Sequence, residues 1–289
     1  MPTARPLTAV RAAVSHRDCR VWACSLVVWI GFAMGNHVAA QTREQTFQAG
    51  EQLYYTLHYK YGLLSIIGGT AEYGLSEAQY NQQSVCQTTM TFKSTAFVDK
   101  MITMMRDTLY AYSTWKNFKP LYQHRVIHEG NSHYTEDLQI LQHGSNYTKV
   151  SLVRQKAIGT VIDTIITVRT EAYDFLNMFL YLRRLNYVDM QVGDKIFITA
   201  VMGDKAVALT IKYMGLVAVE GVEQDEVLAA HYAMDLTNQT FSKSKNAMEI
   251  WISADENRLP IKLRAQLKIG VAEARLSDYK NLKNGNYLY

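Results

Sequence analysis

The stretch KPLYQHRVIHEGNSHYTEDLQIL, residues 119–141, decides the fold class because it contains a complete predicted β-hairpin. Gly130 and Asn131 at its centre suit a two-residue turn, in which the glycine supplies a positive φ. The flanking residues include many β-branched and aromatic side chains, which are typical of strands. This turn predicts six cross-strand pairs: Glu129–Ser132, His128–His133, Ile127–Tyr134, Val126–Thr135, Arg125–Glu136 and His124–Asp137.

Similar runs, separated by turn residues, continue on both sides of this hairpin. All 19 tyrosines fall after residue 40, among Val, Ile, Thr and Phe. Gly203-Asp204 predicts a second hairpin, and Pro260 fits the first residue of a strand after a polar turn at 255–258. The pattern predicts a mainly β protein. We expect a large curved antiparallel sheet, in the form of a half-barrel, a barrel or a two-layer sandwich, with one or two short helices.

The run EQLYYTLHYKYG, residues 51–62, alternates as a half-buried strand does. Its apolar positions, Tyr55, Leu57 and Tyr59, fall on one face, which we expect to be the inner one. The following turn is expected among three glycines: Gly62, Gly68 and Gly69.

A helix of about 14 residues is predicted from Ala172 to Leu185. Acidic residues in its first turn and two arginines in its last turn suit the helix macrodipole. We expect it to pack on the sheet as a plug or brace rather than to move as a lid. The segment 96–108, AFVDKMITMMRDT, fits either a short helix or an irregular crossover. The apolar stripe of the longer helix consists of Ala172, Phe175, Leu176, Phe179, Leu182 and Leu185.

The first 40 residues predict a secretory signal peptide. Four arginines precede an apolar segment at 21–33, which is too short to span a bilayer because a spanning helix needs about 20 residues. Val38 and Ala40 place small side chains at the −3 and −1 positions of a cut before Gln41. An uncleaved anchor is the alternative, and the short apolar segment disfavours it.

Residues 41–289 carry 26 basic and 25 acidic side chains, a balance that offers no basic stripe for nucleic acid. They contain one cysteine, Cys86, so no internal disulfide can form. Cys86 lies in a predicted strand and is expected to be a buried small residue rather than a nucleophile. The core alone must hold the fold, as a single β domain at 41–289 or as two β subdomains joined near 170–186.

Four segments in this order resemble a family of exported bacterial proteins, the domain of unknown function 3108. They are FQAGEQLYYTLHY with GGTAEY, then RVIHEG, then YDFLNMFLYLRRLNYVDMQVGDKIFI, and IWISADENRLPIKLRAQLKIGVAEARL. The resemblance covers roughly 47–282. The helix departs from the family's S-x-x-Y-Y-L-R pattern, with Asn177 at its start and Phe179-Leu180-Tyr181-Leu182-Arg183 after it.

The resemblance implies a β-rich exported domain and, more loosely, a half-barrel like those of lipoprotein carriers. It implies no catalytic residues. Together with the leader, it predicts a location in the periplasm or at the periphery of the outer membrane of a Gram-negative bacterium. No transmembrane helix is expected after processing, and peripheral membrane contact remains open.

The chain shows weak signals for catalysis. His128 and His133 would be about 5 Å apart at their Cβ atoms, near enough to share a metal. A zinc site usually needs about three or four protein ligands, so a polar, solvent-facing side of the hairpin is the favoured interpretation. Motifs for an activated serine, a phosphate loop or a dinucleotide are missing from the sequence. We therefore predict a non-enzymatic protein without a cofactor, with a metal-dependent hydrolase as the alternative.

The favoured function is binding of an apolar or lipid-like ligand on the concave face of the curled sheet, where the helix could close the site. A structural or assembly factor that binds another envelope protein is the alternative. Ordinary core packing is the competing role for every residue proposed to line the site. These candidate residues are Tyr55, Leu57, Tyr59, Met101, Met105, Phe175, Phe179 and Trp251.

Overall fold

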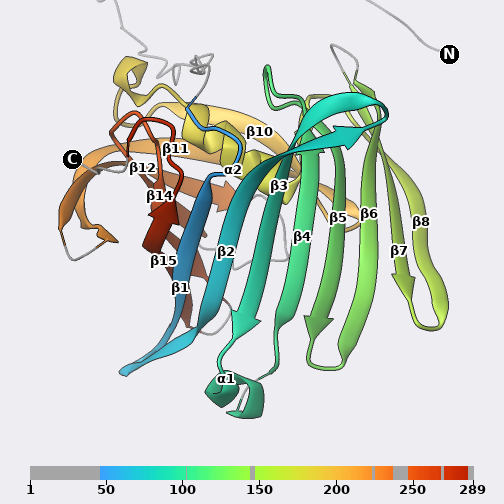
Figure 1. Cartoon of the computed structure of the whole chain (residues 1–289), viewed down its shortest axis with the longest axis horizontal. Coiled ribbons are helices and arrows are strands. Elements are labelled where there is room, and N and C mark those ends of the chain that lie inside the picture. Colours follow the sequence, from blue (N-terminus) through green and yellow to red (C-terminus); the bar gives the residue numbers. More distant parts are fainter. Residues whose placement is uncertain are drawn as a thin grey trace, which may run out of the picture. The chain divides into compact units, whose positions relative to one another are not determined.

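A computed structural model describes residues 46–101, 103–143, 147–222, 225–236, 247–267 and 270–285. The predicted signal peptide lies outside these residues. The described residues form one 15-stranded sheet, which is nearly closed and barrel-like (Figure 1). Its strands are β1 (Gln52–Tyr61), β2 (Leu64–Tyr80), β3 (Gln83–Ser94), β4 (Arg106–Ser113), β5 (Pro120–Glu129), β6 (Ser132–His143), β7 (Thr148–Lys156), β8 (Gly159–Val168), β9 (Ala172–Tyr173), β10 (Lys195–Met202), β11 (Lys205–Glu220), β12 (Glu226–Leu236), β13 (Met248–Ser253), β14 (Pro260–Gln266) and β15 (Val271–Lys280).

The prediction of a mainly β, curled antiparallel sheet is confirmed. Almost every strand pairs with its neighbours in sequence, and β1 pairs with both β2 and β15. The two edges of the sheet are therefore β8 and the two-residue strand β9, which follow each other in the chain. The helical segments are α1 (Ala96–Met101), α2 (Phe175–Arg184) and the 3-10 helix η1 (Tyr187–Asp189).

The hairpin of β5 and β6 has the predicted register. All six predicted cross-strand pairs, from Glu129–Ser132 to His124–Asp137, are present. Gly130 has a φ of +55°, as a two-residue turn of this kind requires. The hairpin at Gly203 and the strand that begins at Pro260 are confirmed as well.

The predicted bounds of the long helix were wrong at its start. Ala172 and Tyr173 form β9, which pairs in parallel with Thr199 and Ala200 of β10. The helix starts one residue after Asp174, because the Asp174 side chain accepts hydrogen bonds from two backbone amides of the first turn. α2 is therefore 10 residues long, shorter than expected.

The turn after β1 is also tighter than predicted. It consists of Gly62 and Leu63, and β2 starts at Leu64. Gly68 and Gly69 lie inside β2, where the register shifts opposite Leu57. The ambiguous segment 96–108 contains both the short helix α1 and the start of β4.

α2 lies against the inner surface of the sheet, where it contacts β3, β4, β9 and β10. Eight of its ten residues are buried, including both arginines of its last turn. The apolar residues of α2 join one large core cluster with side chains from both walls of the sheet. α2 therefore packs as a plug, as predicted.

Side chains, rather than a strand ladder, close the seam between the two edge strands, β8 and β9. Thr170, between β8 and β9, links the two sides: its carbonyl accepts a hydrogen bond from the Thr148 hydroxyl of β7 at 2.8 Å, and its own hydroxyl lies 2.8 Å from that of Thr199 in β10. A second, smaller apolar cluster spans the seam. It consists of Leu138, Val150, Leu152, Val168, Ala172 and Val201.

Candidate functional site

A buried ion pair fixes the last turn of α2 to the start of β1. Arg183 and Glu51 are 0% and 1% exposed, and their two N–O distances are 2.5 and 3.0 Å. Arg183 also donates to the carbonyls of Asn257 and Arg258, and its guanidinium stacks on the Phe47 ring. Burial alone would lower the pKa of Arg183, but the Glu51 carboxylate raises it above its usual value. We call this end of the sheet, where these side chains are buried, the sealed end.

The first turn of α2 is held by a buried carboxylate. Asp174 Oδ1 accepts hydrogen bonds from the amides of Leu176 and Asn177 at 3.0 Å and from the Gln123 side chain at 3.2 Å. Burial raises the pKa of Asp174 to about 6, although the hydrogen bonds from Asn177 and Leu176 act in the opposite direction. The cap therefore joins α2 to β5 as well as starting the helix.

On β1, β3, β13 and β14, inward-facing apolar side chains become more exposed with distance from the sealed end, whereas the inward-facing residues of β4 are buried along its whole length. On β1, Leu53 and Tyr55 are buried, whereas Leu57 and Tyr59 are only half-buried. On β3, Met90 is buried and Phe92 is half-buried.

The same gradient occurs on the opposite wall. Ile261 of β14 is buried and Leu263 is half-buried. On β13, Ile250 is buried and Met248 is half-buried. The open end of the sheet, which carries the β1–β2 turn and α1, thus presents four apolar side chains that pack on the core and remain partly exposed. We call these the mouth residues: Leu57, Phe92, Met248 and Leu263.

The inner face of β5–β7 is charged, unlike the mouth residues. Glu136 is 1% exposed and accepts hydrogen bonds from Arg125 at 3.1 Å and from Arg154 at 2.9 Å. Arg154 also lies over the Tyr134 ring. The Arg125–Glu136 pair was predicted from the hairpin, whereas Arg154 was missed because no turn signal fixes the register of β6 and β7.

Five of the predicted lining residues share the inner face. Tyr55 donates to the Pro260 carbonyl at 3.0 Å, deep in the core. Phe175 and Phe179 make an edge-to-face contact at 5.1 Å on α2, against the same core. The remaining two, Leu57 and Tyr59, lie towards the open end.

The other three predicted lining residues lie apart from this face. Met101 is exposed on α1, and Met105 forms an isolated bridge with Glu129 beside the β5–β6 turn. Trp251 lies on the opposite face of β13 from the core residue Ile250 and stacks on His231 at 4.4 Å. Phe92, Met248 and Leu263 were not predicted, because only the long-range pairing of the sheet places them on the same core cluster as Leu57.

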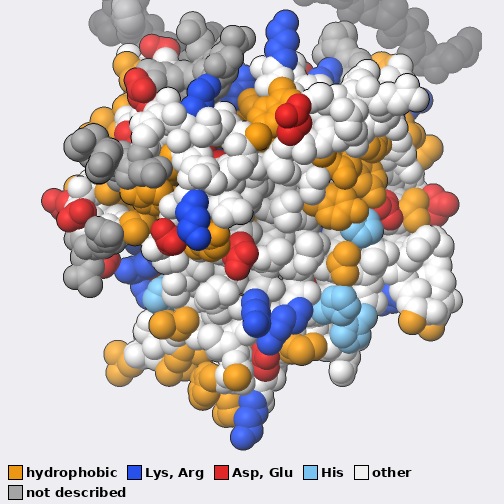
Figure 2. Space-filling model, in the orientation of Figure 1, with side chains coloured by type: hydrophobic (Ala, Val, Ile, Leu, Met, Phe, Trp, Pro, Cys, Tyr) orange, Lys and Arg blue, Asp and Glu red, His pale blue; other side chains and the backbone are white. Residues whose placement is uncertain are grey.

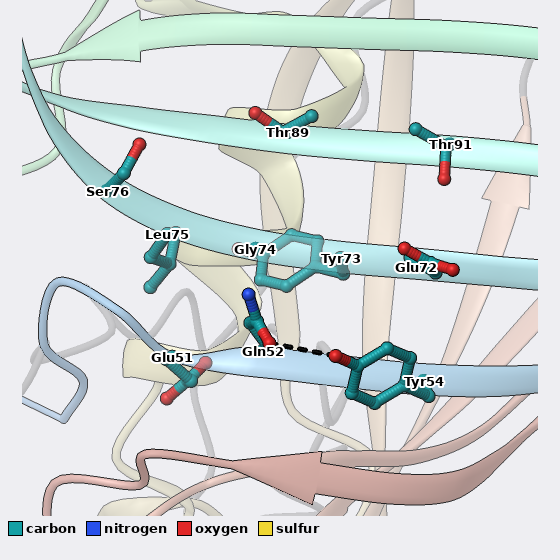
Figure 3. A pocket seen from close by; sticks show the side chains of 10 residues that line it. All are labelled: Glu51, Gln52, Tyr54, Glu72, Tyr73, Gly74, Leu75, Ser76, Thr89 and Thr91. Carbon is teal, nitrogen blue, oxygen red and sulfur yellow. Dashed lines mark hydrogen bonds between the residues drawn. The ribbon is translucent and has the colours of Figure 1, made fainter.

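A shallow cleft of about 240 Å³ lies on the outer face of β1–β3 (Figure 3). Gly74 leaves its floor without a side chain, and Glu72, Ser76, Thr89 and Thr91 surround it with polar groups. The cleft is open to solvent and has a mixed lining, so it is not the enclosed apolar site expected for the inner face.

The predicted histidine pair forms on the outer face of the hairpin. His128 and His133 lie opposite each other, with ring centroids 5.0 Å apart. His124 pairs instead with Asp137, at 2.7 Å. Within the described ranges, no cluster of three or more His, Cys, Asp or Glu side chains is arranged to hold a metal ion.

The lone cysteine of residues 41–289 is a core residue. Cys86 is fully buried inside β3, next to Thr88 and Ser113. Burial raises the pKa of its thiol to about 12, so the thiolate needed for nucleophilic attack does not form near neutral pH.

The fold and this inner face define a β-barrel-like protein. A solved structure with a similar fold is the β-barrel-like protein of domain of unknown function DUF1849 from Brucella abortus, with a TM-score of 0.52 and 12% identity. The match covers 84% of this chain and 99% of that one. The family described as "Protein of unknown function (DUF3108)" matches residues 54–277, and the chain belongs to it. A search of curated proteins finds no match.

Proposed function

We propose that this protein is an exported component of the bacterial envelope that binds an apolar or lipid-like molecule and does not catalyse a reaction. The observation that carries the proposal is the gradient of exposure on the inner face. Apolar side chains are buried at the sealed end and partly exposed at the mouth residues.

An apolar ligand at the mouth would complete the burial of these side chains. Shielding apolar surface from water contributes about 25 cal/mol per Å², so a chain-like ligand that covers several mouth residues gains several kcal/mol. α2 and the core cluster fill the sealed end, and this limits the ligand to the open half of the sheet. The charged inner face of β5–β7 could meet a polar headgroup.

The location rests on the leader and on the family. The first 40 residues have the features of a secretory signal peptide. In the part of the chain that the structure describes, no helix has the length and apolar character needed to cross a membrane.

The direct test is to identify what the exported protein carries. The full chain is produced in a Gram-negative host and purified without detergent from the periplasmic fraction. Its N-terminus is then determined, and an organic extract is analysed by mass spectrometry. We expect an N-terminus at or near Gln41 and one apolar compound in stoichiometric amount. An extract without such a compound would count against the ligand, and retention of the chain in the cytoplasm would count against export.

An assembly role is the second candidate, and one feature of the sheet favours it. β8 is an edge strand, and its outer face exposes Val161 and Ile165, which are 41% and 62% accessible. Exposed edge strands can pair with an extended segment of another protein. A photo-crosslinking amino acid at Ile165 would capture such a partner in the envelope, whereas the same group at the buried Val150 would not.

A further inference from the structure

The open end carries a second apolar feature, on the outside of the sheet. Large hydrophobic side chains project from the β1–β2 turn, from the start of β2 and from the segment around α1 (Figure 2). Leu63 is fully exposed, and Phe97 and Met101 are 57% and 63% exposed. We call this feature the apolar rim, which consists of Leu63, Leu64, Ile67, Phe97, Met101 and Met104.

Backbone hydrogen bonds hold the parts of the rim at one end of the sheet. The amide of Thr95, just before α1, donates to the Gly68 carbonyl of β2 at 3.0 Å. The segment after α1 is tied to the β5–β6 turn, where the Gly130 amide donates to the Met104 carbonyl at 2.8 Å. Figure 1 shows α1 and the β1–β2 turn at the same end of the sheet. The rim is therefore a fixed surface.

The rim is unusual for a surface that faces only water. Tight turns are dominated by Gly, Asn, Asp, Ser and Pro, yet this turn places Leu63 at its tip and Leu64 directly after it. A group of large exposed apolar side chains marks an interaction site. These side chains project outward from two separate elements, which suits insertion into a soft interface better than fitting into a rigid partner.

The charges beside the rim favour an anionic surface. Lys93, shortly before α1, and Lys100, in the last turn of α1, both have exposed side chains. Arg106 binds Asp99 at 2.5 Å, which neutralises the acid of α1. Basic residues near an anionic leaflet strengthen binding, and their long side chains can lie along the interface while the apolar groups insert.

We propose that the apolar rim docks the protein on the surface of a bilayer that contains anionic lipid, with the open end of the sheet towards the membrane. Leu63 and Leu64 at one tip and Phe97 and Met101 on α1 enter the interfacial region. The docked orientation would place the mouth residues next to the bilayer. This inference goes beyond the proposed ligand and does not require it.

The test compares rim variants with matched variants near η1. The exported protein is mixed with sedimentable vesicles of phosphatidylethanolamine and phosphatidylglycerol, and with phosphatidylcholine vesicles. We expect binding to the anionic vesicles, and at least a tenfold loss of binding in the double variant Leu63→Ser/Phe97→Ser. The control Val188→Ser/Val192→Ser changes two apolar side chains near η1 that are 63% and 71% exposed, and it should bind as the wild type does.

A local probe separates the rim from any effect of the N-terminal segment. An environment-sensitive fluorophore is attached at Leu63→Cys or Val192→Cys, with Cys19 and Cys24 replaced by serine, while the buried Cys86 stays unlabelled. Anionic vesicles should shift the emission at position 63 and leave position 192 unchanged. Equal binding of the rim variant and the wild type, or no vesicle binding by the wild type, would overturn the proposal. Either result would leave the ligand test unaffected, because that test measures bound compound.

Discussion

Arg183 shows how much of this fold depends on a single buried side chain. Its guanidinium binds Glu51 in two places and also binds two carbonyls of the segment before β14. Because α2, β1 and this segment are far apart in sequence, one residue links three parts of the chain. The buried Arg183 guanidinium has all of its hydrogen-bond partners only when all three parts have folded.

We predict that Arg183→Met lowers the free energy of unfolding by about 3–5 kcal/mol, because the Glu51 carboxylate remains buried without its partner. The matched control is Arg264→Met, which removes an exposed partner of Glu249 and should cost less than about 1 kcal/mol. Both are measured by urea unfolding. The double variant Arg183→Met/Glu51→Gln should recover part of the loss, and no recovery would contradict this explanation.

Asp174 should give the stability a measurable pH dependence. Its pKa is raised to about 6 in the folded state, and in the unfolded chain it returns to about 4. Between these values the folded state binds more protons, so the contribution of this group to stability falls as the pH rises from 4 to 6. Above pH 6 the contribution is constant.

The variant Asp174→Asn keeps a side-chain acceptor for the helix cap and removes the titration. We expect the difference in unfolding free energy, wild type minus variant, to fall by up to about 3 kcal/mol between pH 4 and 6.5. Urea unfolding at several pH values measures this difference. A difference that does not change with pH would show that Asp174 titrates in the folded state as it does in the unfolded chain.

Sequence patterns predicted individual residues well where their partners are local. The pairs Arg125–Glu136 and His124–Asp137 followed directly from the Gly130-Asn131 turn. The Arg183–Glu51 pair could not be predicted, because 132 residues separate its members and no periodicity connects them. Trp251 shows the same limit, since its face of β13 depends on pairing with distant strands.

At the scale of elements, β2 passes very close to β3 at one point. A Cβ atom on Gly69 would lie 2.4 Å from the Lys93 carbonyl oxygen, whereas on the adjacent Gly68 it would meet nothing closer than 3.7 Å. These two neighbouring glycines therefore provide a matched pair for testing the β2–β3 contact.

We predict that Gly69→Ala destabilises the protein by about 1–3 kcal/mol, because backbone must move to accommodate the methyl group. Gly68→Ala should be nearly neutral. Thermal unfolding of the two variants beside the wild type measures the difference. Equal melting temperatures for the two variants would mean that the strands are further apart than the structure shows.

The elements differ in how well the sequence predicts them. Hairpins with a Gly-Asn or Gly-Asp turn were predicted correctly, because the turn chemistry fixes the register. The helix start was misplaced because Ala172 and Tyr173 continue its apolar pattern, while the parallel pairing with β10 makes them a strand. Gly68 and Gly69 resemble turn residues, but they lie inside β2. The close approach of β3 explains why position 69 is a glycine.

At the scale of the whole molecule, pairing of β1 with β15 joins the first and the last described strand of the chain at the middle of the sheet. This pairing leaves β8 and β9 as the edges, and β9 leads directly into α2. The curled antiparallel class could be predicted from strand composition and short turns. The position of α2 inside the sheet and the open end opposite it could not, because they depend on which strands close the sheet.

The sealed end, the mouth residues and the apolar rim lie along one direction of the sheet. α2 and its buried ion pair block one end, and the partly exposed apolar side chains and the rim mark the other. This polarity distinguishes the molecule from a barrel with a uniformly packed core. It is also the feature on which the proposed ligand binding depends.

The measurement that tests this account most directly is native mass spectrometry of the exported protein and two variants of β3. Phe92→Glu places a charge among the mouth residues, and Thr91→Glu places the same charge on the outer face of the same strand. We predict one apolar molecule bound per chain in the wild type and in Thr91→Glu, and none in Phe92→Glu, with all three proteins folded. A ligand retained in Phe92→Glu, or a wild type without any ligand, would contradict the central claim.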